Sequence, residues 1–406
     1  MNYISRNITV FLLLSSLLAA GQSSPAKLDI VSWNVEWYGA SFESPADDNL
    51  QEQNVKTVLR LLDADLYGLV EVVDTMRLRR LTDSLGAHFD FVISPFSSNN
   101  STGTGASWLN GQKLAFIYNT NIFTNVSARG LMRNSGPAYT NWASGRFPYM
   151  LTADVTINNI TKKINFILIH GKAGSSESDY NRRRDGAQEL KDTLDTYYSS
   201  SLNFIIGDFN DALNTTICTS CQSQASSFDM IVRDSTDNDH YKSITLPLGQ
   251  AGQTSMTNYP NVVDNHVISN EVAPFYIPNS VSIRTDIAAM IPNYGITTSD
   301  HYPVYSQYQL TGISTDLIEV DPSWLGLSVS PNPFINQVQV TIKKPARDLK
   351  IELIDANGRV LSSHQYKNLQ VSHLTIPTPG LPHGSYYLRI TSSKYRATLK
   401  LVKISS

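Results

Sequence analysis

The sequence has only two cysteines, Cys218 and Cys221, which form a Cys-x-x-Cys unit. A zinc site would need further cysteine or histidine ligands, and only His240 is even loosely near. In an exported protein, a small disulfide-closed loop is favoured over redox chemistry for such a pair. We therefore expect Cys218 and Cys221 to form a structural disulfide.

The stretch that most resembles a membrane segment is too short to cross a bilayer. Ile8–Ala20 is an apolar run of 13 residues, whereas a membrane-spanning helix needs about 20. Arg6 precedes the run and Ala19-Ala20-Gly21 offers a cleavage site, so residues 1–21 are expected to be a signal peptide. No cysteine follows directly, which argues against a lipoprotein. We expect an exported protein without stable membrane insertion.

A strong net charge is also lacking, although the charge is unevenly distributed. Residues 22–310 hold 20 Lys+Arg and 29 Asp+Glu, a net of −9, and residues 311–406 hold 11 and 6, a net of +5. A net-acidic first part argues against tight passive binding of nucleic acid. It is compatible with an enzyme that gathers carboxylates around a metal ion.

Strands and helices alternate at first, and mostly strands follow. We expect a strand at Lys27–Trp37, helices over 52–63 and 74–85, and a helix that ends near Tyr198. Polar residues of catalytic type repeatedly follow apolar runs. This pattern predicts a two-sheet α/β sandwich with an active site at one end of the sheets.

Two of these runs end in acidic residues. Asp208 and Asn210 follow the buried run Leu202–Ile206 and the turn residue Gly207. Alone, this segment is more readily interpreted as a turn with a solvated aspartate. Glu71 lies at the end of the apolar segment 64–73, where a charge is costly unless it is paired or bound to a cation. Glu71 is therefore the best single candidate for a metal ligand.

Further candidates have both structural and functional interpretations. Asn34 and Glu36 have strand spacing and are expected to share one face, although an edge strand with solvated polar residues is an alternative. Arg146 is either an ordinary solvated arginine or a bidentate phosphate clamp. His170 follows an expected strand over 164–169, where a lone histidine is more often structural than catalytic.

An ordered set of motifs carries a family resemblance: Trp-Asn-x-Glu (33–36), Gly-Leu-Val-Glu (68–71), Ile-His (169–170), Gly-Asp-Phe-Asn (207–210), Val-Asp (263–264) and Ser-Asp-His-Tyr-Pro-Val (299–304). Over residues 26–310 it resembles the endonuclease/exonuclease/phosphatase superfamily, the fold of deoxyribonuclease I. The resemblance implies a four-layer α/β sandwich for the domain 22–310 and hydrolysis of phosphodiesters by in-line attack of water.

The resemblance also implies a role for each matching residue. Glu71, supported by Glu36 and Asp300, would hold Mg²⁺ or Mn²⁺. Asp264 would orient His301, Asp208 and Asn210 would position the attacking water and the phosphate, Asn34 and Arg146 would bind phosphate oxygens, and His170 would stabilise the transition state or protonate the leaving oxygen.

The sequence departs from the superfamily pattern in two places. Members that resemble deoxyribonuclease I carry a glutamate after the strand that corresponds to 89–93, and it pairs with the histidine at position 170; here Ser94-Pro95-Phe96 offers no acid. Glu36 stands where many relatives have the shorter aspartate. The first departure leaves the acid role of His170 open, and the second weakens Glu36 as a metal ligand.

Short strands with Pro, Asn-Gly and Gly turns from Leu327 onward predict a second, all-β sandwich domain over 327–406, after a linker at 311–326. Its Pro-Asn-Pro-Phe (331–334), Asp-x-x-Gly-Arg (355–359) and Leu-x-x-Gly-x-Tyr (381–386) motifs resemble the C-terminal sorting domain of type IX secretion in Bacteroidetes. The resemblance implies the secretion machinery as a partner and a secreted or cell-surface location. An accessory carbohydrate- or nucleic-acid-binding sandwich is the alternative.

The sequence thus predicts a secreted, monomeric, metal-dependent nuclease that degrades extracellular DNA. RNA is a further candidate substrate. A sphingomyelinase-like or polyphosphate phosphoesterase would use the same site, because specificity resides in surface loops such as 97–108. No long apolar membrane-docking hairpin is evident, which favours nucleic acid. A non-catalytic binding protein on this fold is the third hypothesis.

Overall fold

The chain folds into two compact units, Met1–Thr311 and Gly312–Ser406, which are considered separately. The computed structural model describes residues 26–100, 103–232, 241–311, 318–319, 327–343, 346–369, 372–392 and 395–405. The expected signal peptide, His240 and most of the expected linker 311–326 lie outside these residues.

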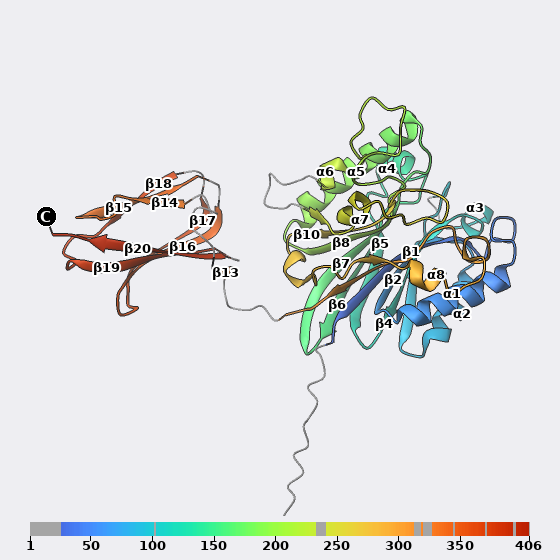
Figure 1. Ribbon diagram of the computed structural model, residues 1–406, viewed down its shortest axis with the longest axis horizontal. Coiled ribbons are helices and arrows are strands. Elements are labelled where there is room, and N and C mark those ends of the chain that lie inside the picture. The colour runs from blue at the N-terminus through green and yellow to red at the C-terminus, as the bar shows by residue number, and fades with distance from the viewer. Residues whose placement is uncertain are drawn as a thin grey trace, which may run out of the picture. The chain divides into compact units, whose positions relative to one another are not determined.

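Two six-stranded mixed sheets form the centre of the first unit (Figure 1). The first has the order β11-β12-β1-β2-β4-β3 and contains β1 (Leu28–Tyr38), β2 (Leu66–Val72), β3 (Phe89–Ile93), β4 (Lys113–Asn119), β11 (Ser282–Ile283) and β12 (Val304–Tyr308). The second has the order β5-β6-β7-β8-β10-β9 and contains β5 (Phe123–Gly130), β6 (Tyr149–Ile157), β7 (Ile160–His170), β8 (Leu202–Asp208), β9 (Tyr241–Ser243) and β10 (Asp264–Ser269).

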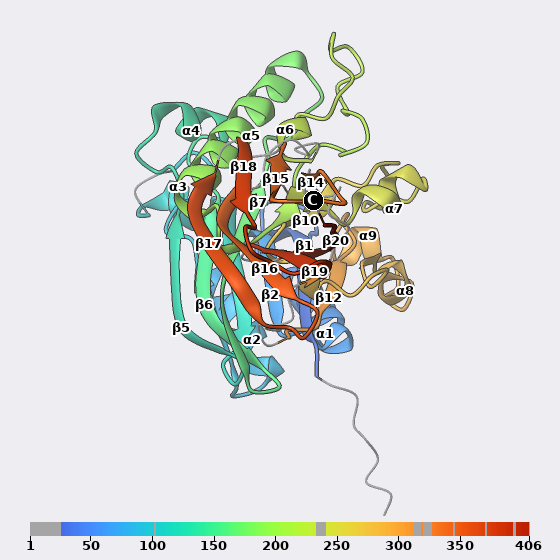
Figure 2. The ribbon, with the colours of Figure 1, turned by 90° about the vertical axis from the view of Figure 1, so that its left-hand side faces the viewer.

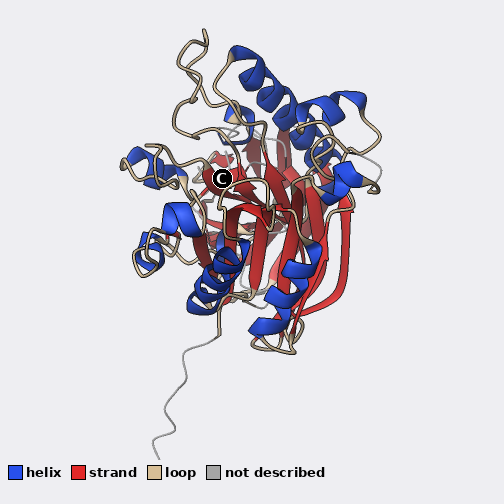
Figure 3. Ribbon diagram, turned by 90° about the vertical axis from the view of Figure 1, so that its right-hand side faces the viewer, coloured by secondary structure: helices blue, strands red, loops and turns tan. Residues whose placement is uncertain are grey.

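Helices cover the outer faces of both sheets, as Figure 3 shows. One apolar cluster joins the first sheet to α1 (Asp48–Leu62), α2 (Thr75–Leu85), α8 (Thr285–Ala288) and α9 (Tyr294–Thr297). A second cluster lies between the sheets, and a third joins the second sheet to α4 (Gly136–Asn141), α5 (Glu177–Tyr198) and α6 (Asp229–Val232). The connections contain α3 (Ala106–Leu109), α7 (Leu246–Gln250) and a 3₁₀ turn, Ala273–Phe275. The expected four-layer sandwich is confirmed.

The long helices begin where the sequence supplies caps. The side chains of Asp47 and Asp74 accept hydrogen bonds from the first free backbone N–H groups of α1 and α2. Ser176 and Asp179 form a reciprocal capping box at α5. Each cap satisfies donors that the helix itself leaves unpaired.

Parallel strand pairs gather the polar strand ends at one edge of the sandwich. β1 is parallel to β2 and β7 is parallel to β8, so the carboxyl ends of all four strands can meet there. β10 is antiparallel to β8, with Asp264 opposite Asp208, so its first residue lies at the same edge. β12 is antiparallel to β1, which brings the segment before Val304 to this edge too.

The end of β1 departs from the expected regular strand. The β1–β2 pairing shifts between Asn34 and Tyr38, and Glu36, Trp37 and Glu71 have φ angles of 45°, 45° and 65°. The regular strand on which Asn34 and Glu36 were expected to share one face is therefore interrupted beyond Asn34, and Glu36 projects from an irregular segment.

A buried glutamine holds this irregular segment in place. The Gln51 side chain on α1 donates to the backbone carbonyls of Val35, Glu36 and Thr298 and accepts from the N–H of Gly39. A regular ladder would have satisfied such backbone groups, and Gln51 satisfies them instead.

The second unit consists of two β-sheets around one apolar core. A five-stranded sheet has the order β13-β20-β19-β16-β17, and a three-stranded sheet has the order β14-β15-β18. The strands are β13 (Ile318–Glu319), β14 (Leu327–Ser330), β15 (Gln337–Ile342), β16 (Ala346–Asp355), β17 (Val360–Leu369), β18 (Ser372–Pro377), β19 (Gly384–Thr391) and β20 (Tyr395–Lys403). Phe334, Val340, Leu353 and Leu388 are among the residues that fill the core. In the described part of the chain, no helix has the length and apolarity needed to cross a membrane.

The inter-sheet core predicts a large cost for removing Phe204. Its ring stacks on Phe166 at 4.9 Å and meets the edge of Tyr308 at 4.8 Å. Phe204→Ala is expected to lower the free energy of unfolding by about 3–5 kcal/mol. Phe42→Ala, at a side chain that is 58% exposed, should change it by less than ~0.5 kcal/mol. Urea denaturation followed by tryptophan fluorescence measures both, and equal effects would contradict the layer arrangement.

Candidate active site

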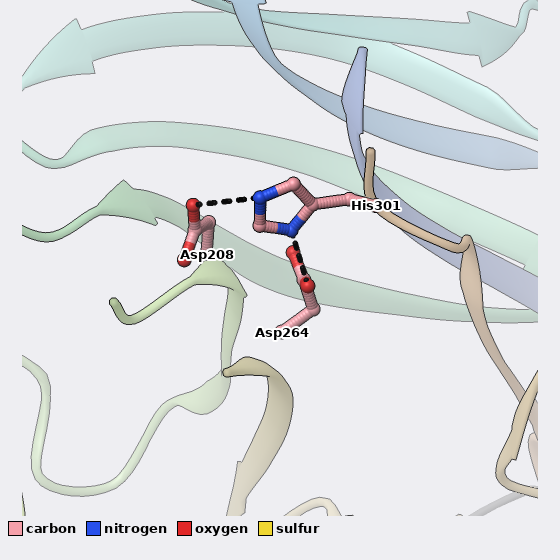
Figure 4. Close-up of side chains that lie close together, drawn as sticks. All are labelled: Asp208, Asp264 and His301. Atoms are coloured by element: carbon pink, nitrogen blue, oxygen red, sulfur yellow. Dashed lines mark hydrogen bonds and ion pairs between the residues drawn. The ribbon is translucent and has the colours of Figure 1, made fainter. Parts of the chain in front are cut away.

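His301 lies between two buried aspartates at the shared edge (Figure 4). Its Nδ1 is 2.7 Å from Asp264 Oδ2, and its Nε2 is 4.0 Å from Asp208 Oδ2. One potential ligand atom from each of the three residues lies within 4.8 Å of the other two. The short contact fixes the imidazole, and the longer one leaves Nε2 facing Asp208.

Asn34 and His170 connect Glu71 to this group. The Asn34 amide donates to Glu71 Oε1 and to Asp208 Oδ2, both at 3.1 Å. His170 Nε2 is 3.4 Å from Asp208 Oδ2 and 3.6 Å from Glu71 Oε1. The ends of β1, β2, β7 and β8 therefore contribute one continuous polar cluster.

Asn210 lies beside Asp208, as their spacing suggested. The backbone N–H of Asn210 donates to Asp208 Oδ1 at 2.7 Å, and its amide donates to Asp208 Oδ2 at 3.1 Å. Asn210 has a φ of 50°, a conformation that asparagine adopts more readily than most residues. The turn after β8 thus presents both side chains to the same place.

Glu36 and Asp300 lie together. The backbone N–H of Asp300 donates to Glu36 Oε2 at 2.8 Å, and the Asp300 carboxylate, 41% exposed, is 3.8 Å from His301 Nε2. Neither residue belongs to the close group of Asp208, Asp264 and His301. Their expected contribution to a metal site beside Glu71 stays a prediction.

Arg146 is buried, and its guanidinium is directed at protein acceptors. Nε donates to the carbonyl of His170 at 3.2 Å, Nη2 to that of Gly171 at 2.8 Å, and Nη1 to Gln112 and to Ser98. These contacts fasten the end of β7 to the segment after β3. The guanidinium also adds positive charge near Glu71 and Asp208. Its expected role as a phosphate clamp stays a prediction.

Burial dominates the electrostatics of the acids. Desolvation, together with the charge of Asp264, raises the pKa of Asp208 to about 7. Desolvation also raises the pKa of Glu71, against the hydrogen bond from Asn34. The pKa of Glu36 rises to about 7 through burial and the neighbouring Asp300. All three acids are thus expected to release protons to solvent when a cation binds them.

The two histidines are shifted in opposite directions. Burial alone would lower the pKa of His301, but the carboxylate of Asp264 outweighs it and holds the pKa well above its ordinary value. Burial, with the positive charges of Arg146 and His301, holds the pKa of His170 well below its ordinary value. At neutral pH His301 is therefore protonated and His170 is neutral.

The donor set fits a divalent cation. Asp208, Asp264 and Glu71 crowd buried carboxylates into one cluster, and Asp264 Oδ1 is buried without a hydrogen-bond partner among the described residues. Carboxylate and amide oxygens are the ligands that Mg²⁺ and Mn²⁺ favour. A bound cation would offset the cost of burying these charges.

The missing acid partner of His170 has a structural counterpart. His170 Nδ1 is buried and has no hydrogen-bond partner in the described part of the chain. Since Nε2 faces two carboxylates, the neutral ring is expected to carry its proton on Nε2. In that tautomer His170 is a hydrogen-bond donor toward the cluster.

Several supporting residues were assigned no role from the sequence. Ser299 donates to the carbonyl of Asn34 and accepts from the N–H of His301, and Ser255 accepts from the N–H of Asp264. The carbonyl of His301 accepts from Trp33 Nε1 and from the hydroxyl of Tyr294. Ser299 could have been recognised from the sequence, because it directly precedes the Asp-His pair. Gln51 left a weaker signal as a polar residue four positions before Val55 on the buried face of α1.

The segment after Asn210 is anchored separately. Cys218 and Cys221 are bonded to each other. Fully buried Asp211 accepts hydrogen bonds from Thr216, Ile217 and Ser227. This network holds the chain directly behind the Asp208–Asn210 turn.

The first unit has the endonuclease/exonuclease/phosphatase fold. An endonuclease/exonuclease/phosphatase structure from Beutenbergia cavernae is 15% identical, with a TM-score of 0.50 over 93% of this chain and 99% of that one. A Bacteroides vulgatus structure of the same description has 13% identity and a TM-score of 0.49 over 70% and 100% of the two chains. The human nocturnin catalytic domain with a bound sulfate has 14% identity and a TM-score of 0.45 over 71% and 94%.

Residues 328–404 match the secretion system C-terminal sorting domain. The match confirms the resemblance seen in the sequence and indicates export by this route to the cell surface or beyond. A comparison with curated proteins gives no match. At the identities of the solved structures, the likeness shows the fold, so function is argued from the site.

The raised pKa of Asp208 predicts a pH-dependent gain in stability when the residue is replaced. The folded state binds this proton more tightly than the unfolded state, so ionisation destabilises the fold as pH rises from about 4 to about 7. Without metal at pH 8, Asp208→Asn should raise the free energy of unfolding by ~1–3 kcal/mol, and by less at pH 5.

Thermal unfolding in EDTA at the two pH values measures this effect. Asp83→Asn, at an exposed helix position, serves as the control and should leave the free energy of unfolding unchanged at both pH values. If Asp208→Asn instead lowered the free energy of unfolding at pH 8, the ionised carboxylate of Asp208 would not be destabilising the fold.

Proposed function

We propose that the first unit is a metal-dependent phosphodiesterase that hydrolyses extracellular nucleic acid, with DNA as its principal substrate. The observation that carries this proposal is the Asp264–His301–Asp208 arrangement beside Glu71, Asn34 and His170. A carboxylate with a pKa near 7, an oriented cationic imidazole and neutral donors can supply the proton transfer and charge stabilisation of phosphodiester hydrolysis.

Each group has a task that its geometry supports. Asp264 orients His301 through Nδ1, so Nε2–H points at the space before Asp208 and can donate to a phosphate oxygen. Asp208, with a pKa of about 7, accepts the proton of the attacking water, and Asn210 positions that water. Asn34 and His170, whose N–H groups face Asp208 and Glu71, are the proposed donors to the phosphate oxygens.

A divalent cation would be held by Glu71 with the oxygens of the neighbouring cluster, and Glu36 and Asp300 are its proposed supporting ligands. When bound, it supplies Lewis-acid stabilisation of the negative charge that develops on the phosphate oxygens. The protein's own contribution is to present preorganised donors in a site from which bulk water is largely excluded.

The extracellular destination of the chain supports a polymeric nucleic acid as the substrate. The sorting domain directs the chain out of the cell, where an exported phosphodiesterase meets free DNA and RNA. The net acidic first unit argues for binding through the metal and directed donors rather than through a broad basic surface.

The direct test is nicking of supercoiled plasmid by the full chain with Mg²⁺, with Mn²⁺ and with EDTA. Activity is expected with metal and not with EDTA. His301→Ala should lower the rate by at least about 10²-fold, because the loss removes an oriented proton donor. His88→Ala, at an exposed histidine of the same unit, should have no effect.

An intact plasmid under all conditions would contradict the nuclease proposal. Release of phosphocholine or inorganic phosphate would then assign the same site to a phospholipid headgroup or a phosphomonoester. Equal activity of His301→Ala and the unmodified chain would contradict the site assignment itself.

Asp264→Asn tests the orientation of His301. The amide removes the charge that raises the pKa of His301, so the protonated imidazole is lost at a lower pH than in the unmodified chain. We expect the alkaline limb of the nicking rate to move to lower pH and the maximal rate to fall about 10²–10⁴-fold. An unchanged pH profile would show that His301 acts without Asp264.

A further inference from the structure

A hollow of about 750 Å³ lies on the second sheet, away from the active site. It is lined from β5, β6, β7 and the end of α5, elements that Figure 2 labels. It reaches Leu202, the first residue of β8, whereas Asp208 at the other end of that strand belongs to the active site. Five residues of β7 separate lining residue Asn165 from His170, about 17 Å at ~3.3 Å per residue. We call this site the β5–β7 groove; the lining residues used here are Arg129, Thr152, Lys163, Asn165, Tyr197 and Tyr198.

Two exposed cations line the groove without an acidic partner. Neither Arg129 nor Lys163 lies within ion-pair distance of a carboxylate in the ranges that the structure describes. Asp154 is the cross-strand neighbour of Lys163, but its carboxylate accepts from the Asn125 amide. Within a net acidic unit, this concave surface is locally positive and suits an anionic ligand.

The floor of the groove is polar where the rest of the sheet face is apolar. Ile167 and Ile169 on β7 pack in the core beneath α5, whereas Asn165, on the same face, is 7% exposed. Its Oδ1 accepts from the Thr152 hydroxyl at 2.8 Å, and its Nδ2 donates to Asn203 at 2.9 Å. The sheet face changes from apolar to polar at the groove, where the carboxyl end of α5 contributes Tyr197 and Tyr198. This row of mutually hydrogen-bonded side chains makes the floor of the groove polar.

Two tyrosines add aromatic surface beside the cations. Tyr197 is 75% exposed, an unusual position for a large aromatic side chain without a partner surface. The Arg129 guanidinium lies 5.7 Å from the centroid of the Tyr198 ring. Exposed rings beside cations are the combination on which single-stranded nucleic acid bases stack while their phosphates are neutralised.

We propose that the β5–β7 groove is an accessory site that binds a single-stranded segment of nucleic acid. Arg129 and Lys163 contact phosphates, and Tyr197 stacks on a base. The inference deepens the proposed nuclease function and rests on it for the identity of the ligand. At the ~3.4 Å per nucleotide of a stacked strand, about 17 Å corresponds to roughly five nucleotides, so a strand of about that length can occupy both sites.

Binding of fluorescein-labelled dT15 to the full chain in EDTA, measured by anisotropy at several salt concentrations, tests the groove without turnover. Arg129→Glu/Lys163→Glu should raise Kd about tenfold or more at low salt and lower the slope of log Kd against log salt by about 1.4, from ~0.7 per lost phosphate contact. Tyr197→Ala should raise Kd at least about fivefold. The matched charge control is Lys27→Glu/Lys242→Glu, at two exposed lysines outside the groove, and it should leave the Kd less affected.

Hydrolysis of bis(p-nitrophenyl) phosphate with Mg²⁺, a substrate too small to reach the groove, separates this proposal from the proposed function. Unchanged hydrolysis in the groove variants, with weakened dT15 binding, supports the accessory site. Unchanged dT15 binding in those variants overturns it, even if the plasmid is nicked. If dT15 binding depends on the groove but no phosphodiester is cleaved, the accessory binding site is supported and the proposed nuclease function is wrong. If heparin binds through the groove and dT15 does not, the site is one for sulfated polysaccharide and the nucleic-acid assignment is wrong.

Discussion

The main constraint on the first unit is the free-energy cost of burying several carboxylates at the edge of the sandwich where two pairs of parallel strands end. β1 with β2 and β7 with β8 bring Asn34, Glu71, His170 and Asp208 to one place, and β10 adds Asp264. Such a concentration of acid in a poorly solvated site is unfavourable unless a cation, a proton or an oriented donor compensates it. The surrounding hydrogen bonds and the shifted pKa values follow from that constraint.

Much of the supporting structure serves to hold these groups in position. Gln51 stabilises the irregular end of β1, Ser299 joins His301 to Asn34, and Arg146 fastens the backbone at His170. Positive φ angles at Glu36, Trp37 and Glu71 mark the same place as locally strained. The fold thus accepts local strain where the proposed chemistry occurs and compensates for it with buried polar contacts.

The sequence predicted the layers and the strand-end residues because both leave strong local patterns. Apolar runs that end in Asp208 or Glu71 can be recognised without any tertiary information, and so can the apolar spacing of the helices. β5 was missed because polar residues such as Thr124, Asn125 and Arg129 occupy most of this exposed edge strand, so no apolar run marks it. The inward hydrogen bonds of Arg146 and the irregular geometry of Glu36 depend on contacts between distant segments, which spacing alone does not encode. The absent partner of His170 was indicated in advance by the missing acid in Ser94-Pro95-Phe96.

We propose that the gathered carboxylates form a divalent cation site that holds protons in the absence of metal. Calorimetric titration of the full chain with Mn²⁺ at pH 7, in buffers of different ionisation enthalpy, measures both the binding and the protons released with it. We expect saturable binding with proton release, since acids with raised pKa values must ionise to bind the metal, and a large loss of affinity in Glu71→Gln. Binding without proton release, or with the same affinity in Glu71→Gln, would contradict it.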